Sequence, residues 1–191
     1  MKRIFMLISL FAPMMLSAQI TVDFEGNDYD SIGVYDMWEE SPFRTGELSG
    51  NCAVIANHLK DSLNKSDKVL ALQRSRYGSN TFGVKVDLKT SFELTPQIKY
   101  VTFMVHRPYS GRVMAIGLGK RQDRPWQDDV EQFTVISKTD VPADGWCSVS
   151  LPVKGVGKID IHSIIIVPDC ESPHDYVEDK ACYIDNIEVK M

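Results

Sequence analysis

Positive charge is concentrated in one stretch of the sequence, between Arg74 and Arg124. This stretch holds ten Lys and Arg residues against three Asp and Glu residues, although the whole chain has a net charge of −5. The planar guanidinium of arginine binds carboxylate and sulfate groups through paired hydrogen bonds, and sugar rings stack on aromatic faces. Aromatic residues are interleaved with these arginines, which predicts a site for an acidic polysaccharide. The candidate ligand-binding residues are Arg76, Tyr77, His106, Arg107, Tyr109, Arg124 and Trp126.

The same charges have a second interpretation. Charged side chains on the solvated faces of a sheet commonly pair with acidic neighbours, in which case they bind no ligand. Trp126 lies in the polar segment RQDRPWQDD and is the best candidate for an exposed aromatic platform, whereas Trp146 opens a strand and is expected to be structural.

A second chemical feature is a carboxylate that shares a strand face with apolar side chains. In the last predicted strand, Asp185 alternates in step with Tyr183 and Ile187. A buried carboxylate requires hydrogen-bond donors or a metal ion. The first predicted strand ends at Glu25 and is followed by Asn27, so hard oxygen ligands of the kind that suit Ca²⁺ occur there as well. The alternative is that Asp185 accepts backbone hydrogen bonds in a turn.

Catalytic patterns are weak in this sequence. His106, Arg107 and Tyr109 supply the residue types of a polysaccharide lyase, but adjacent strand residues point to opposite faces of a sheet. A glycosidase requires two facing carboxylates, and no such pair is recognisable among the acids Asp128, Asp129 and Glu131. GxSxG, HExxH and glycine-rich phosphate-binding motifs do not occur. The sequence therefore favours a binding module over an enzyme.

The four cysteines are expected to form disulfides, because an even number of cysteines in an exported chain favours them. Three pairings are possible. Cys170 and Cys182 flank a polar stretch between two apolar runs, which suggests a disulfide across that loop and leaves Cys52 to pair with Cys147. A zinc site is disfavoured, since the sequence holds no CxxC pair and its histidines are scattered.

The N-terminal residues have the pattern of a secretory signal peptide. Lys2 and Arg3 precede an apolar run over 4–16 that is too short to span a bilayer, and Ala18 provides a small residue before the cleavage point. We expect a signal peptide at 1–18 and an exported domain at 19–191, located in the periplasm, at the cell surface or in the medium. The acidic balance argues against a nucleic-acid partner, and no later run is long enough for membrane insertion.

Period-two alternation of apolar and polar residues recurs along the chain and predicts β-strands. The pattern indicates about ten strands, separated by turn sequences such as YGSN, PYSG and DG, with one short helical candidate within 57–66. The predicted strands are 19–25, 52–57, 68–74, 82–88, 101–106, 112–118, 131–137, 147–153, 159–167 and 182–190. So many strands in one domain are typical of an all-β sandwich or barrel.

Four motifs in order carry a family resemblance: VDFEG at 22–26, NHLKDSLNKSDKV at 57–69, GWCSVSLPV at 145–153 and YIDNIEV at 183–189. Together they resemble the jelly-roll, galactose-binding-like carbohydrate-binding modules of secreted Bacteroidetes-type glycan-utilisation proteins. The resemblance implies a jelly-roll β-sandwich of two antiparallel sheets and non-catalytic binding of a polysaccharide or oligosaccharide. It also implies a structural calcium ion between the first and last strands, at Glu25 and Asp185. A structural or protein-binding module of an exported surface assembly is the remaining alternative.

Overall fold

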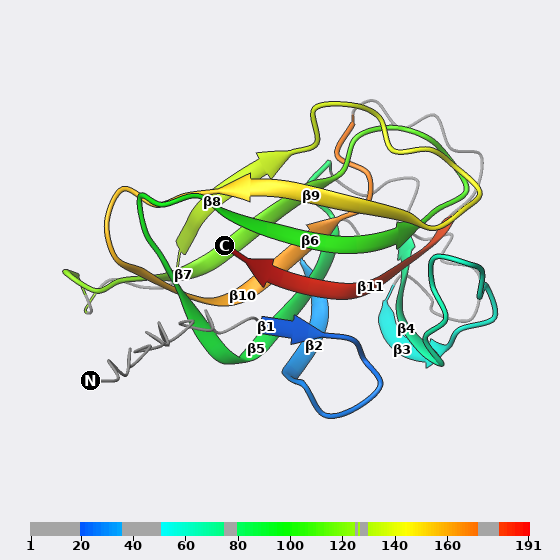
Figure 1. The fold of residues 1–191 in the computed structure, drawn as a ribbon, viewed down its shortest axis with the longest axis horizontal. Helices are drawn as coiled ribbons and strands as arrows, with labels where there is room; N and C mark the ends of the chain where they lie inside the picture. Colours follow the sequence, from blue (N-terminus) through cyan, green and yellow to red (C-terminus); the bar gives the residue numbers. More distant parts are fainter. Residues whose placement is uncertain (1–19, 36–50, 75–79, 125, 127–129, 172–179) are drawn as a thin grey trace, which may run out of the picture.

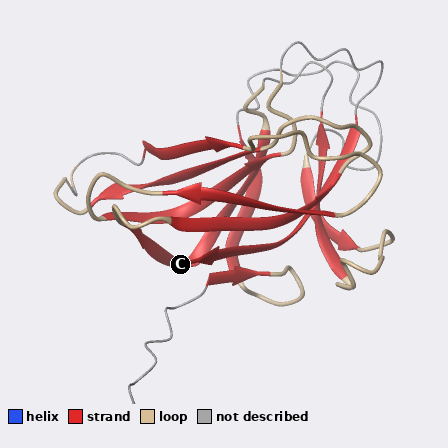
Figure 2. Cartoon of the chain, turned by 45° about the horizontal axis from the view of Figure 1, so that its top comes forward, coloured by secondary structure: helices blue, strands red, loops and turns tan. Residues whose placement is uncertain are grey.

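The computed structural model describes residues 20–35, 51–74, 80–124, 126, 130–171 and 180–191. Two antiparallel β-sheets pack face to face, and the described residues include no helix (Figures 1 and 2). Accordingly, no described segment is a helix of the length and hydropathy that crossing a membrane requires. The predicted signal peptide at 1–18 lies outside the described residues.

The six-stranded sheet has the order β3-β4-β11-β6-β9, with β1 pairing with β11 beside this path. Its strands are β1 (Ile20–Val22), β3 (Cys52–Ala56), β4 (Lys68–Arg74), β6 (Lys99–His106), β9 (Cys147–Val153) and β11 (Lys180–Lys190). The five-stranded sheet has the order β2-β5-β10-β7-β8. Its strands are β2 (Tyr29–Tyr35), β5 (Gly83–Leu94), β7 (Met114–Arg121), β8 (Val130–Ile136) and β10 (Ile159–Val167).

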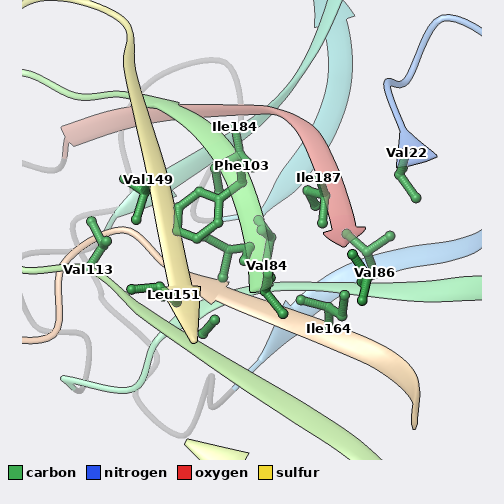
Figure 3. Close-up of a cluster of buried hydrophobic side chains, with 14 of the residues drawn as sticks. Val22, Val84, Val86, Phe103, Val113, Val149, Leu151, Ile164, Ile184 and Ile187 are labelled. Atoms are coloured by element: carbon green, nitrogen blue, oxygen red, sulfur yellow. The ribbon is translucent and has the colours of Figure 1, made fainter. Parts of the chain in front are cut away.

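Alternation along the strands builds the core between the two sheets. In β6 the buried residues Val101, Phe103 and Val105 alternate with half-buried or exposed ones, so that one face of the strand is apolar. Figure 3 shows Phe103 among side chains of both sheets, including Val84 of the five-stranded sheet. Each such fully buried side chain contributes about 1.5–3 kcal/mol. The all-β sandwich of two antiparallel sheets is confirmed, and the described residues form eleven strands.

All ten predicted strands overlap observed ones, but β2 was not predicted. Its sequence YDSIGVY contains no fully buried residue, so the apolar alternation that reveals the other strands is missing. The helical prediction within 57–66 is wrong, since this segment is a loop. The side chains of Asn57, Asp61 and Asn64 accept hydrogen bonds from backbone N–H groups two or three residues further along. Such local bonds compete with helix formation.

The predicted disulfides are not formed in this structure, in which the four cysteines are free thiols. Cys52 and Cys147 lie in β3 and β9, the outermost strands of the six-stranded sheet order, with three strands between them. Four inter-strand spacings amount to about 19 Å, whereas a disulfide needs a Cα–Cα distance of about 4.4–6.8 Å. Cys170 donates through its thiol to the carbonyl of Arg112 at 3.4 Å, and the buried Cys182 lies 2.9 Å from the Tyr109 hydroxyl.

Candidate functional site

A network of polar side chains centres on Asp87, on the outer face of the five-stranded sheet. Ser31 in β2 and Ser163 in β10 are both in register with Asp87 in β5, so three adjacent strands present side chains in one row. The Ser163 hydroxyl donates to Oδ1 of Asp87 at 2.5 Å, and the Ser31 hydroxyl donates to Oδ2. Lys85 adds an ion pair at 3.0 Å.

The Asp87 network keeps the carboxylate ionised. Partial burial raises the pKa of Asp87, but the hydrogen bonds from Ser163, Ser31 and Lys85 outweigh it and hold the pKa below its usual value. Against β7, β10 carries one extra residue, a β-bulge, between Ile161 and Ser163. Such bulges re-aim side chains near functional sites.

A second contact crosses the whole outer face of this sheet. The hydroxyl of Tyr35 in β2 donates to Oε1 of Glu131 in β8 at 2.6 Å. These are the two outermost strands of the sheet, which would be about 19 Å apart if the sheet were flat. The two side chains cannot span that distance, so the sheet must curl. We refer to this outer face, with Tyr35, Lys85, Asp87 and Glu131, as the concave face.

The floor of the concave face is aliphatic. Tyr35 and the half-buried Leu118 pack against a cluster of buried side chains that includes Ile116 and Ile165. The concave face therefore combines the ring of Tyr35 with carboxylates, the Ser31 hydroxyl and an ammonium group, above a buried apolar cluster. This combination suits a ligand with apolar ring faces and many hydroxyl groups.

His162, Ser163 and Asp87 do not form a hydrolase triad. The Ser163 hydroxyl has one proton, which it donates to Asp87, so Nδ1 of His162, at 2.7 Å, donates to the Ser163 oxygen. In a nucleophilic triad the histidine lies between the serine and the acid and accepts the hydroxyl proton. Ser163 is also fully buried. The arrangement fixes Asp87 in place and does not activate a nucleophile.

The structure separates the predicted ligand-binding residues into two groups at opposite ends of the sandwich (Figure 1). Arg124 and Trp126 follow the last residue of β7. His106 is the last residue of β6, and Arg107 and Tyr109 come between it and the start of β7. The eight residues of β7 separate these ends by about 23 Å, at about 3.3 Å per residue. Trp126 is 79% exposed and its role as a platform stays a prediction.

Arg76 and Tyr77, the two other predicted ligand residues, lie outside the described residues.

The prediction that Arg107 binds a ligand is wrong. Its side chain is fully buried, and its guanidinium donates to the backbone carbonyls of Gly111, Val141 and Pro168. The guanidinium carbon also lies 5.3 Å from the centre of the Tyr109 ring. Arg107 thus ties together three chain segments at one end of the sandwich and is not accessible to a polysaccharide.

His106 is also held by the protein itself. Its ring packs edge-on between Trp146 and Tyr183, with ring centres 5.6 and 5.9 Å away. Burial lowers the pKa of His106, against the opposing effect of Asp144 and Asp61. With His106 among aromatic rings and Arg107 buried, the structure does not assemble the trio considered for a lyase.

Several other charges of the basic stretch are paired with acidic neighbours. Arg112 lies 3.0 Å from Glu171, and Arg121 makes two hydrogen bonds of 2.9 Å to Asp123. Hydrogen bonding to these carboxylates raises the pKa of both arginines. The interpretation of these charges as paired surface groups is confirmed for Arg112 and Arg121.

Glu25 and Asp185 lie near each other under the loop 57–67. Asp185 is fully buried; its Oδ2 accepts a hydrogen bond from Asn64 at 2.8 Å and its Oδ1 accepts one from the backbone of Asn186 at 2.7 Å. Burial raises the pKa of Asp185, the hydrogen bonds from Ser66, Asn64 and Asn186 lower it, and the nearby charge of Glu25 raises it further. The Glu25 carboxylate accepts backbone hydrogen bonds from Asp67 and Lys68.

This pair of carboxylates fits part of a calcium site. Two like charges that disfavour each other, one of them fully buried, would both be stabilised by a cation. The described residues contain no group of three or more His, Cys, Asp or Glu side chains suited to a metal, so amide and backbone oxygens would have to complete the coordination. Asn27, the third predicted ligand, is exposed and makes no side-chain hydrogen bond to another described residue.

Comparison with known proteins gives a match at the level of structure. No protein-family description matches the sequence, and no curated protein matches it. Among solved structures, the chain is similar to part of one that contains the CBM22-1 and GH10 modules of endo-1,4-β-D-xylanase 10B from Clostridium thermocellum, solved with xylohexaose. The TM-score is 0.57 at 10% identity, over 90% of this chain and 28% of that one.

Two single modules match over most of their own length. A family 30 carbohydrate-binding module has a TM-score of 0.54 at 11% identity, covering 91% of this chain and 87% of its own. The CBM22-1 xylan-binding domain of Xyn10C from Paenibacillus barcinonensis has a TM-score of 0.51 at 9% identity, covering 89% and 91%. At such identities the likeness concerns the fold. The described part of this chain has the jelly-roll β-sandwich fold seen in these carbohydrate-binding modules.

Proposed function

We propose that this protein is a non-catalytic glycan-binding module that holds a polysaccharide chain on the concave face. The observation that carries the proposal is the concave face itself. It presents the ring of Tyr35 and the fixed carboxylate of Asp87 above an aliphatic floor. The fold is that of modules whose names record xylan or carbohydrate binding. The expected export of the chain agrees with this function, since polysaccharides are met outside the cytoplasm.

The geometry favours a neutral glycan over the acidic one expected from the sequence. Among the described residues of the basic stretch, Arg107 is buried, while Arg112, Arg121 and Lys85 are paired with carboxylates. The concave face carries Asp87 and Glu131 with Lys85, which gives no excess of positive charge. Carboxylates and hydroxyls suit the hydroxyl groups of neutral sugars.

A glycan array of neutral and anionic polysaccharides tests this proposal, with retention measured at low and at high salt. We expect retention on a neutral glycan that salt does not weaken, since no charge pair between protein and ligand is screened. Asp87→Asn should reduce it, while Asp123→Asn, which alters an exposed carboxylate paired with Arg121, should not. Retention only on anionic glycans, lost at high salt, would reverse the assignment of ligand. Retention unaffected by Asp87→Asn would exclude the concave face.

We further propose that Glu25 and Asp185 hold a structural calcium ion, with amide and backbone oxygens completing its shell. Support comes from the buried carboxylate of Asp185 beside that of Glu25. The ion would neutralise this pair and fix the loop 57–67 against β11, which Asn64 already contacts through Asp185. It would have no part in ligand chemistry.

A further inference from the structure

A groove of about 600 Å³ runs between β8 and β9. These two strands lie on the side of the sandwich where the two sheets come together (Figure 1). β8 is an outermost strand of the five-stranded sheet and β9 of the six-stranded sheet, and the two strands contact each other. The loop after β8, from Ser137 to Pro142, forms one wall. The groove is thus distinct from the concave face, which is the outer surface of the five-stranded sheet.

The groove exposes apolar surface that the protein does not cover. Tyr100 of β6 is 41% exposed at its rim and pairs in register with Pro152 of β9. Ile136 at the end of β8 is 43% exposed. Val135 and Leu151, which belong to the apolar core, also line the groove. An exposed tyrosine beside a proline gives a flat apolar surface on which a ring can stack.

Three polar side chains that line the groove have no hydrogen-bond or ion-pair partner among the described residues: Ser148, Ser150 and Lys138. Asp140 also lines the groove, and its charge acts on Arg112. Ser137, by contrast, uses its hydroxyl to donate to the carbonyl of Thr139 and to accept from the backbone of Val113. The groove therefore offers hydroxyls, an ammonium group and a carboxylate, which are donors and acceptors in similar measure.

The charges and hydrogen-bonding groups that line the groove indicate which class of ligand suits it. Lys138 and Asp140 carry opposite charges, so the groove favours no charged ligand. A peptide that added a strand to β9 would need its row of backbone N–H groups, and Pro152 lacks one. Hydroxyls around an exposed aromatic ring suit a sugar, and a groove of this volume falls in the range for a ligand of a few rings.

We propose that the groove between β8 and β9 is a second glycan-binding site, for a short neutral oligosaccharide that stacks on Tyr100 and bonds to Ser148 and Ser150. It is independent of the concave-face site. With both sites present, one chain holds two glycan segments, and the second binding event gains from the high local concentration that the first one creates.

The test is a titration of the ¹⁵N-labelled protein with xylohexaose, cellohexaose and mannohexaose, followed by amide shifts and by calorimetric stoichiometry. We expect one of these probes to shift the amides of Ser148, Ser150 and Thr139, with two ligands bound per chain. Tyr100→Ala should remove the groove shifts and reduce the stoichiometry from two to one. A double variant, Ser148→Ala with Ser150→Ala, keeps the ring and should weaken the groove site at least several-fold.

Tyr35→Phe serves as the matched control, because it changes the concave face and leaves the groove intact. Shifts confined to the concave face, unchanged by Tyr100→Ala, would overturn the groove site and leave the proposed function standing. Shifts confined to the groove would support the groove site and overturn the concave-face proposal. If no probe shifts any amide of the groove, the proposed second site is wrong.

Discussion

Tyr35 donates a hydrogen bond to Glu131 across the full width of the five-stranded sheet, at 2.6 Å. This contact joins β2 to β8, the two outermost strands of that sheet, and does so over an aliphatic floor. A sheet curled in this way presents a trough, and a trough holds a linear polymer along its length. The shape of the proposed binding face and the position of its aromatic ring are therefore set by the same pair of residues.

Removing the hydroxyl of Tyr35 tests this relationship. Tyr35→Phe keeps the ring but leaves Glu131 without this donor, so we expect a loss of about 0.5–1.5 kcal/mol in the free energy of unfolding. Glycan affinity should fall about tenfold, because the ring is no longer held at one position. Chemical denaturation and calorimetry measure the two effects. Tyr29→Phe in the same strand is the control. Wild-type affinity in Tyr35→Phe would show that the ligand binds elsewhere.

Substitution of Arg107 should have a different effect: a large loss of protein stability with no change in glycan binding. Arg107→Lys keeps the charge but cannot donate to the three carbonyls of Gly111, Val141 and Pro168 at once. A buried ammonium and unsatisfied carbonyls should destabilise the fold by about 3–5 kcal/mol. Thermal unfolding measures this loss. The glycan affinity of the folded fraction should equal that of the wild type, and weaker binding by fully folded Arg107→Lys would restore Arg107 as a ligand residue.

The sandwich could be predicted from the sequence because apolar and polar residues alternate regularly in its core strands, as they do in β6 around Phe103. It also pointed to the Glu25 and Asp185 pair, through a carboxylate placed among apolar side chains. The concave face was missed for local reasons. Tyr35 lies in β2, which lacks alternation, and a register shift between β10 and β5 places Ser163 opposite Asp87. Of these residues, only Asp87 could be placed from the sequence, because it is a polar residue at an outward position in a strand where apolar and polar residues alternate.

The basic stretch shows a second reason why the binding site could not be predicted from the sequence. Arg107 and Arg124 belong to the same run of charges but lie at opposite ends of the sandwich, because β7 separates them. Charge counted along a chain does not reveal that Glu171 neutralises Arg112 from 59 residues away. Only the pairing of strands decides which charges remain available for a ligand.

The buried carboxylate of Asp185 predicts a particular pH dependence in calcium-free protein. Burial raises the pKa of Asp185 in the folded chain above its value of about 3.9 in the unfolded chain. The stability that protonated Asp185 contributes is thus fully present below pH 4 and is lost as the pH rises through the folded-state pKa. Asp185→Asn cannot ionise. With EGTA present, the stability of Asp185→Asn relative to wild type should increase between pH 4 and pH 7.

Denaturant unfolding at several pH values measures this difference, with Asp123→Asn as the control on an exposed carboxylate. The pKa of Asp123 is lowered by its hydrogen bond to Arg121, so the effect of that variant should change only as the pH falls below about 4 and should stay constant between about pH 5 and pH 7. A stability difference between Asp185→Asn and wild type that stays constant with pH would mean that Asp185 is ionised in the folded protein without penalty.

Bound Ca²⁺ should offset the loss of protein stability that ionised, buried Asp185 causes. An ion that binds only the folded protein stabilises it by about 2.7 kcal/mol at one hundred times its dissociation constant. We expect the melting temperature at pH 7 to fall in EGTA and to recover with excess Ca²⁺. Mg²⁺ should restore less, because it demands a stricter octahedral shell. Glu25→Gln and Asp185→Asn should abolish the response, while Asp123→Asn should keep it. A melting temperature that EGTA leaves unchanged would contradict the calcium site. Hydrogen bonds from Ser66, Asn64 and Asn186 to Asp185, and from Asp67 and Lys68 to Glu25, would then hold the pair without an ion.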